Sequence, residues 1–449
     1  MNVRTFPNRA AALAATAALA TCGLLDVSNP NDLVEEDIRK IEAAEAVVNG
    51  TLALVSSSVS QSWQPYLVAS DELYWIGSRD AWLSLDKGFV DDPLNEFIDG
   101  PFPAMGQARW MSDLAIEILA NHVEEAETDA LKTAMAHLLA RANLYSGIIY
   151  TVVGEIQEDF AFSNKTEAGE PVGAANMYAV LDGAIERLSA AIAGFDRHGG
   201  DPGVTLNAMA VRARARHSRA IWDVVNPRAS GSGLVNSAGA GADAAAVIEA
   251  AGGNGADRLF NLTYSSASAS NAMAEWINDR KENQIDLSVV TVNAANDING
   301  IALKDPIDDV EDPSVIKWLN QWKGGSYLDK GGIYPPLTLA STRMMHIILA
   351  ENALAGGNES RFAEHINHIR AMDGLTAFSG QIPDMDMLRH TRRVTVLLQG
   401  LRLADMYRWG IEDPKWQGSS DAVKCPGVML PVSNIERQAN PQDWKDGCS

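Results

Sequence analysis

The chain has 449 residues, of which 46% are hydrophobic and 21% are charged, and its formal net charge is −22 at pH 7. This composition is typical of a globular protein, and the length allows more than one domain. Contacts to phosphates need clustered lysine and arginine side chains, so this acidic balance argues against nucleic acid as a partner. It fits a protein whose ligands are neutral.

Residues 1–21 predict a signal peptide. Arg4 and Arg9 stand in a leader without acidic residues, and residues 10–21 are almost entirely alanine and leucine. A basic region followed by a short apolar run is typical of secretion signals. The run is shorter than the roughly 20 apolar residues that a transmembrane helix needs.

Cys22 directly follows this leader. The stretch "LATC" that it ends resembles a bacterial lipobox, in which the cysteine is acylated and becomes the mature N-terminus. Thr21 departs from the pattern, because a smaller residue is usual there. The alternative is an ordinary secretory signal. Acylation at Cys22 predicts that residues 22–449 form a domain anchored to a membrane through lipid.

Helical periodicity dominates the remaining chain and predicts a mainly α fold. The first helix is expected at residues 37–60, and residues 385–410 close the helical part. Between them, helices are expected in pairs at 108–126 and 129–154, at 174–195 and 205–225, and at 337–357 and 360–372. Alanine-rich faces suggest tetratricopeptide-like stacking, because small residues let neighbouring helices pack closely.

Two long segments lack this pattern. Residues 228–255 are rich in glycine, alanine and serine and are expected to be a loop. Residues 284–336 combine glycine, proline, aspartate and asparagine with large aromatic residues, which argue against disorder. Long loops in compact proteins are often functional. We therefore expect an irregular insert at about residues 225–336 in the helical scaffold.

The remaining cysteines, Cys425 and Cys448, lie near the C-terminus. In an oxidising compartment they could form a disulfide, which would stabilise the fold by about 3 kcal/mol in the chain-entropy model. Two free thiols are the alternative.

The densest polar cluster consists of Arg402, Asp405, Arg408 and Trp409. Arg402 and Asp405 can pair across one helical turn, and Trp409 can cap the core, so we expect a structural role. Arg343 and Glu351 are likewise expected in buried ion pairs that hold helices in register.

No sequence motif predicts catalysis. The chain has no G-x-S-x-G elbow, no H-E-x-x-H and no P-loop. No pattern among its acidic residues nominates the two facing carboxylates of a glycosidase. We therefore expect no enzymatic activity and no cofactor.

Metal binding is not predicted either. His365 and His368 could share a metal, but two partly exposed helix histidines are the simpler interpretation. The acidic stretch 296–312 could hold a structural calcium ion, and a solvated acidic loop is the alternative.

Aromatic residues give the most specific indication of function. A flat indole covers the apolar C–H face of a sugar, while neighbouring polar groups bind the hydroxyls. Aromatic residues flanked by aspartate, arginine and lysine are predicted to form an exposed ligand-binding platform: Trp75, Trp82, Trp318, Trp322 and Tyr327. Trp318 and Trp322, four residues apart, could instead anchor a short helix in the core.

The chain resembles the SusD/RagB family at several motifs in matching order. They are "AAEAVVNGTLALV" at 43–55, "SDELYW" at 70–75, "TRMMHIILAENALAGGN" at 342–358, "HINHIRAMDGL" at 365–375, "RRVTVLLQGLRLADMYRWG" at 392–410 and "MLPVSNIERQANP" at 429–441. Thr395 and Gln399 stand where glutamates are usual in the family, and Ser433 replaces a proline.

This resemblance implies an outer-membrane lipoprotein at the cell surface. Proteins of the family hold oligosaccharides, or sometimes peptides, as a lid on a TonB-dependent transporter of the SusC type. The implied fold has tetratricopeptide-like helix pairs supporting an irregular ligand-binding lobe, without catalysis. The alternatives are a surface glycoside hydrolase or other carbohydrate-active enzyme, and a lid without its own ligand site.

Overall fold

The computed structural model describes residues 35–164, 166–198, 200–226, 231–444 and 447–448. The predicted signal peptide and Cys22 lie outside these residues. The chain divides into two compact units, residues 1–44 and 45–449. The described part of the first unit contains α2 (Glu35–Ile38) and the 3-10 turn η1 (Ile41–Ala43). All remaining helices and strands lie in the second unit, apart from the first residue of α3.

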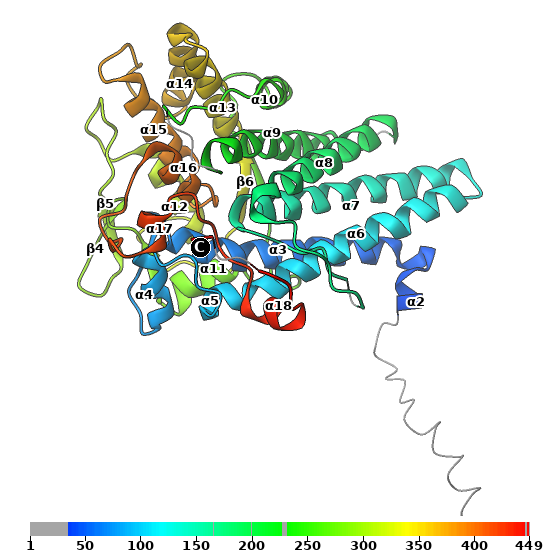
Figure 1. Cartoon of the computed structure of the whole chain (residues 1–449). Coiled ribbons are helices and arrows are strands. Elements are labelled where there is room, and N and C mark those ends of the chain that lie inside the picture. Colours follow the sequence, from blue (N-terminus) through cyan, green and yellow to red (C-terminus); the bar gives the residue numbers. More distant parts are fainter. Residues whose placement is uncertain (1–34, 165, 199, 227–230, 445–446, 449) are drawn as a thin grey trace, which may run out of the picture. The chain divides into compact units, whose positions relative to one another are not determined.

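Long helices form the scaffold of this unit, as the sequence predicts. Figure 1 shows neighbouring helices running side by side from α6 to α9, and each packs on the next. The scaffold helices are α3 (Ala44–Val68), α6 (Pro101–Glu125), α7 (Asp129–Ile156), α8 (Tyr178–His198) and α9 (Pro202–Val225). The mainly α architecture with stacked helix pairs is therefore confirmed.

Glycines allow α7 and α8 to approach closely. A Cβ atom on Gly147 would lie 2.5 Å from Cγ of Leu188, and one on Gly154 would lie 2.6 Å from Cγ of Leu181. Real Cβ atoms do not approach this closely, so larger residues would push the helices apart. Small residues at helix contacts are what the stacking prediction requires.

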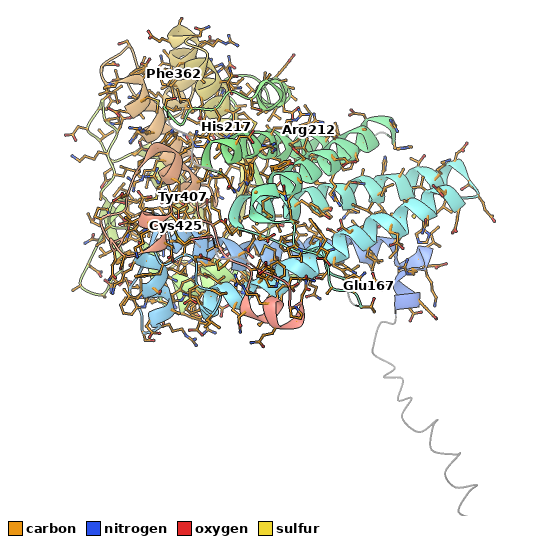
Figure 2. All side chains as sticks on the ribbon, in the orientation of Figure 1. Glu167, Arg212, His217, Phe362, Tyr407 and Cys425 are labelled. Carbon is orange, nitrogen blue, oxygen red and sulfur yellow. A yellow bond between two sulfur atoms is a disulfide. The ribbon has the colours of Figure 1, made fainter. Side chains whose placement is uncertain are left out.

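The predicted loop at residues 228–255 is wrong for residues 238–250, which form α10 (Ala238–Ala250). Ser237 caps the helix by accepting a hydrogen bond from the Ala240 N–H. Arg212 of α9, labelled in Figure 2, holds Asp243 through two hydrogen bonds of 2.9 and 2.7 Å. Alanine favours helix, and burial against α9 and α13 outweighs the cost of the glycines.

The C-terminal helices form a second packed group. They are α13 (Thr342–Ala355), α14 (Glu359–Met372), α15 (Asp384–Thr395) and α16 (Arg402–Trp409). Phe362 of α14, labelled in Figure 2, lies in a core cluster with Ile347 of α13 and Trp409 of α16. Trp409 therefore belongs to the core, as predicted.

The helices predicted at residues 337–357 and 385–410 differ from those in the structure. Residues 337–341 form a buried strand, β6 (Leu337–Ser341), which pairs with β2 (Leu259–Leu262) before α13 begins. Residues 385–410 form two helices, because Leu398 and Gly400 adopt positive φ angles of 60° and 69°. A Cβ atom on Gly400 would also lie 2.7 Å from Nε1 of Trp63, so the break requires glycine.

Short elements form an irregular lobe beside the scaffold. Two further two-stranded sheets join β1 (Leu73–Trp75) to β3 (Asn283–Ile285), and β4 (Val290–Val292) to β5 (Ile298–Ile301). The short helices of this lobe are α4 (Asp80–Asp86), α5 (Glu96–Asp99), α11 (Ala272–Ala274), the π-helical turn η3 (Glu275–Asp279) and α12 (Pro313–Lys323). The lobe therefore combines residues 71–99 with part of the predicted insert.

Buried ion pairs hold the helices in register. Arg343 pairs with Asp257 and Asp373, and Glu351 accepts hydrogen bonds from Arg408 and lies 3.1 Å from His217, labelled in Figure 2. These pairs confirm the structural roles predicted for Arg343 and Glu351.

The predicted pairing of Arg402 with Asp405 is wrong. Arg402 donates two hydrogen bonds of 2.6 and 2.7 Å to Asp71, at the far end of the sequence. Asp405 instead accepts from Arg408 and Arg392. The tertiary fold gives Arg402 a partner distant in sequence, whereas Asp405 pairs with Arg408 one helical turn away and with Arg392 of α15.

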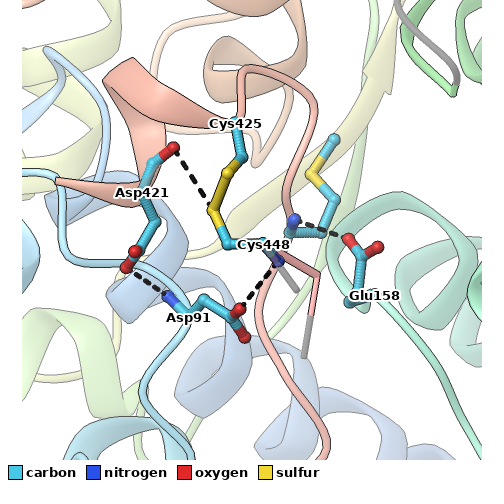
Figure 3. Close-up of a disulfide and its surroundings, with 6 residues drawn as sticks. Asp91, Glu158, Asp421, Cys425 and Cys448 are labelled. Carbon is cyan, nitrogen blue, oxygen red and sulfur yellow. Dashed lines mark hydrogen bonds between the residues drawn. A yellow bond between two sulfur atoms is a disulfide. The ribbon is translucent and has the colours of Figure 1, made fainter. Parts of the chain in front are cut away.

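A disulfide joins Cys425, directly after α17 (Asp421–Lys424), to Cys448 (Figure 3). Figure 3 also shows the backbone N–H of Cys448 donating to the Asp91 carboxylate at 3.1 Å. Between the two cysteines lies α18 (Asn434–Ala439), which packs against α6.

Among the residues that the structure describes, no helix has the length and apolar character that a membrane span requires.

Candidate functional site

Aromatic rings from three short elements meet on the irregular lobe. Trp82 of α4 stacks on Phe97 of α5 with ring centroids 3.6 Å apart. Trp276 of η3 contacts both rings edge-on, at 5.8 Å from Trp82 and 5.3 Å from Phe97. We call these three rings, with Arg79 and Arg280 beside them, the Trp276 cluster. Trp82 is buried, whereas Trp276 remains partly accessible.

Local hydrogen bonds fix the elements that carry the rings. Asn95 caps α5 by accepting from the Phe97 N–H, and its side chain donates to the Ala81 carbonyl at 2.9 Å. These two bonds tie α5 to α4 and explain the stacking of Trp82 on Phe97.

The second anchor is Glu282, which follows η3. Its backbone carbonyl accepts from the N–H groups of Ile76 and Gly77, and its carboxylate accepts from the N–H groups of Ser78 and Arg79. A Cβ atom on Gly77 would lie 2.1 Å from this carboxylate, so the close approach needs glycine. This joint places Arg79 next to Trp276.

Charged groups surround the exposed edge of the cluster. The Cζ atoms of Arg79 and Arg280 lie 5.7 and 4.6 Å from the Trp276 ring centroid. Arg79 also pairs with Glu96 at 2.9 Å, and Arg280 pairs with Glu275 at 3.3 Å. Both pairs are solvent-exposed and therefore weak, so these side chains can turn toward a ligand.

Glu282 provides a fixed negative charge here. Its burial alone would raise its pKa, but hydrogen bonds from the Arg79 and Ser78 N–H groups outweigh burial and hold the pKa below its usual value. The cluster thus combines an accessible indole with two exposed guanidinium donors and, at Glu282, a fixed carboxylate acceptor. Such an arrangement suits a ligand with an apolar face ringed by hydroxyl groups.

The prediction that Trp82 forms part of an exposed platform is wrong, since only 1% of this residue is accessible. It supports Phe97 and Trp276 from below. Its flanking charges, Arg79 and Asp80, reach solvent while the indole turns inward.

The exposure predicted for Trp318 and Trp322 is also wrong. Both lie in α12 with exposed fractions of 5% and 3%, and Trp318 donates from Nε1 to the Val394 carbonyl at 2.8 Å. Their spacing of four residues places both on the inner face of an amphipathic helix. The alternative interpretation, core anchors of a short helix, is the correct one.

Trp75 and Tyr327 are half-buried, so binding by either remains a prediction. Trp75 lies in β1 opposite Asn283. Tyr327 follows α12, and its backbone N–H donates to the Asn320 side chain at 2.8 Å. Among the described residues, no ring contact connects either side chain to the Trp276 cluster.

Sequence reasoning missed Trp276, Phe97 and Arg280. Trp276 stands in "AEWINDRKEN", where polar residues flank it as they flank Trp75. Polar residues beside a tryptophan therefore mark this position too, but Trp276 lies eight residues before the aromatic-rich segment 284–336. Phe97 gave no such signal, because its position depends on the contact between α4 and α5.

The acidic stretch 296–312 pairs largely with basic side chains. Asp305, Asp312 and His390 place ligand atoms within 4.8 Å of one another. However, Arg370 donates to both Asp305 carboxylate oxygens, at 2.6 and 3.1 Å, and Asp312 caps α12. A calcium ion would have to compete with this guanidinium.

His365 is buried, contrary to the expectation of partial exposure. Its Nδ1 lies 3.3 Å from Nδ1 of His346. Burial lowers the pKa of His346 to about 3 and that of His365 to about 4, so both are neutral at pH 7.

Comparisons with known proteins define the fold. Neither a model of a known family nor a curated protein sequence matches the chain. Solved structures of SusD superfamily proteins do match over nearly the whole chain, and the fold is therefore SusD-like.

Three of these structures indicate the extent of the similarity. A SusD homolog from Bacteroides thetaiotaomicron superposes with a TM-score of 0.65 at 12% identity, covering 92% of this chain and 98% of its own. A SusD superfamily protein from the same organism gives 0.62 at 13%, covering 90% and 98%. A SusD-like carbohydrate binding protein from Bacteroides vulgatus gives 0.52 at 13%, covering 82% and 83%.

Proposed function

We propose that this protein is a SusD-like binding protein that captures carbohydrate at the Trp276 cluster. The support is of two kinds. The fold is shared with a protein described as a SusD-like carbohydrate binding protein. The irregular lobe carries an accessible indole with charged hydrogen-bonding groups beside it.

The observation that carries the proposal is the position of Trp276 beside two exposed guanidinium groups, whose Cζ atoms lie 5.7 and 4.6 Å from its ring centroid. Its ring offers an apolar surface to sugar C–H groups, and Phe97 and Trp82 hold it in place. Arg79, Arg280 and Glu96 supply the directional groups that hydroxyls need. A neutral oligosaccharide also meets no repulsion from a chain of net charge −22.

The wider role follows from the resemblance in sequence. We propose that Cys22 carries the lipid anchor of an outer-membrane, surface-facing protein that delivers its ligand to a SusC-type TonB-dependent transporter. No catalytic step is proposed. A surface glycoside hydrolase is the alternative, and product release from a bound oligosaccharide would distinguish it.

Calorimetry with Trp276→Ala tests the proposal. Across a panel of neutral oligosaccharides, loss of one true aromatic contact should cost about 2 kcal/mol, or roughly thirty-fold in affinity. Trp222→Ala is the matched control, because Trp222 is also half-buried with an aromatic neighbour and an arginine, Tyr178 and Arg219, within 6 Å.

The control variant should bind as the wild type does. Equal binding by Trp276→Ala and the wild type would contradict the proposed site. Chromatography of the same mixtures should show intact oligosaccharide, and shorter products would contradict the non-catalytic role.

A further inference from the structure

We propose a second ligand site, for a neutral mono- or disaccharide, in a pocket at the start of α6. The pocket has a volume of about 360 Å³, which falls at the lower end of the range for small-molecule sites. Its wall includes Phe102, Gly106, Arg109 and Trp110 of α6. The choice of ligand class rests on the proposed function, whereas the pocket itself is separate from the Trp276 cluster.

One face of α6 forms the first wall. Phe102, Gly106, Arg109 and Trp110 follow the helical spacing of three, four and seven to eight residues, so they share this face. A Cβ atom on Gly106 would meet no other atom within 4 Å. Glycine in a helix interior costs about 1 kcal/mol relative to alanine, and here it leaves the floor of the pocket open.

The segment after α7 and the helix α18 form the opposite wall. Phe160 and Ala161 supply apolar surface, and Ser163, Asn164 and Glu436 supply polar groups. The Ser163 hydroxyl donates to the Glu436 carboxylate at 3.2 Å and links these two segments.

Arg109 is the buried polar group of the site. Only 6% of it is accessible, and its guanidinium donates to the Ser163 carbonyl and lies 3.6 Å from Asp113. Among the described residues its Nε–H has no acceptor. This nitrogen is shielded from the pocket, so Arg109 shapes the wall by holding Ser163 and Asp113 and does not offer its Nε–H to a ligand.

The lining selects the class of ligand. Arg109 and Glu436 carry opposite charges, which disfavours strongly anionic and strongly cationic ligands alike. The Trp110 ring offers a surface for sugar C–H groups, and Gln107 and Asn164 can both donate to and accept from hydroxyls. A neutral sugar satisfies both requirements.

The test fills the pocket without removing a polar group. Gly106→Leu should fold, because the added side chain enters open space and improves helix propensity. Gly50→Leu is the matched control, since Gly50 is also a helix-interior glycine with nothing within 4 Å of a Cβ atom. Both substitutions are placed in the Trp276→Ala background, so that the first site does not contribute.

Calorimetry with glucose, galactose, mannose, maltose and cellobiose provides the readout. We expect at least one sugar to bind the Gly50→Leu variant and to bind the Gly106→Leu variant at least ten-fold more weakly. If Gly106→Leu does not fold, Trp110→Ala is measured for the same loss. Equal binding by the pocket and control variants, or no binding by the Trp276→Ala background, would overturn this second site. The first site is judged separately, by Trp276→Ala against the wild type.

Discussion

Glu72 is a buried carboxyl group directly beside the buried pair of Asp71 and Arg402. One of its oxygens accepts from the Leu398 N–H at 3.0 Å, and the other has no partner among the described residues. Burial raises the pKa of Glu72 to about 8, so the group is protonated in the folded protein at pH 7.

Glu72→Gln should flatten the pH dependence of stability. The pKa of Glu72 is higher in the folded state than in the unfolded state. Its contribution is therefore fully present below about pH 4.5 and is lost as the pH rises to about 8. The wild type should lose on the order of 4 kcal/mol over this interval relative to the variant. Urea unfolding at several pH values measures the difference, with the exposed Glu124→Gln as the control. Parallel pH profiles for wild type and Glu72→Gln would contradict the assignment.

Arg408 neutralises two buried carboxylates, those of Glu351 and Asp405. Burial would raise the pKa of Glu351, but Arg408 holds it well below its usual value. Arg408→Met leaves Glu351 with the Val235 N–H and with His217, whose own pKa is lowered by burial, so no cation neutralises the carboxylate. We expect a loss of about 3–5 kcal/mol in the free energy of unfolding.

The control for this prediction is Arg361→Met, which removes an exposed pair with Glu364 and should cost less than about 1 kcal/mol. If both variants unfold at the same urea concentration, the structural role of Arg408 is refuted.

The sequence predicts buried charges better than buried aromatic residues. Arg343 and Glu351 stand within long apolar runs, where a charge needs a partner. Trp82 and Trp318 stand among charged residues, and those neighbours do not reveal which way an indole points. Side-chain direction in short elements depends on contacts such as Asn95 to Ala81, between residues that no local pattern connects.

At the scale of elements, periodicity located α6 to α9 and α14, because each is a long amphipathic helix. Periodicity failed where tertiary contacts decide whether a segment forms a helix, a strand or a loop. Residues 238–250 contain glycines typical of loops, yet Arg212 and the buried face of α10 stabilise helix there. Leu337–Ser341 continues an apolar helical pattern but is drawn into a strand by pairing with β2.

The disulfide links the end of α17 covalently to the C-terminal segment. Closing this loop of about 20 residues should stabilise the fold by about 3 kcal/mol in the chain-entropy model. Replacing Cys425 and Cys448 by serine should therefore lower the Tm by several degrees. Differential scanning calorimetry with and without reductant measures this. The Tm of the double serine variant should be the same with and without reductant. A wild-type Tm that does not change with reductant would contradict a stabilising disulfide.

For the whole chain, motif order predicted the fold, although the three matching structures described above share only 12–13% identity with it. The motifs include residues of the buried ion pairs, such as Arg402 and Arg408, which fix how the segments meet. The proposed ligand surface at the Trp276 cluster has no such constraint, so its residues could not be located from these motifs.

Membrane attachment is the whole-molecule property that Cys22 predicts. Cys22→Ala should release the protein from the membrane fraction, because we propose that acyl chains on Cys22 anchor it to the membrane. Cell fractionation and the mass of the N-terminal peptide measure it. Retention of the variant in the membrane, with no acyl mass on the wild type, would contradict lipidation.

Carbohydrate binding at the Trp276 cluster can be observed directly. Its most direct test is a crystal structure of the protein soaked with the neutral oligosaccharide that binds most tightly in calorimetry. We expect electron density for a sugar ring against the Trp276 indole, with hydroxyl groups within hydrogen-bonding distance of Arg79, Arg280 or Glu96. Density for the sugar elsewhere, with the Trp276 surface bare, would contradict it.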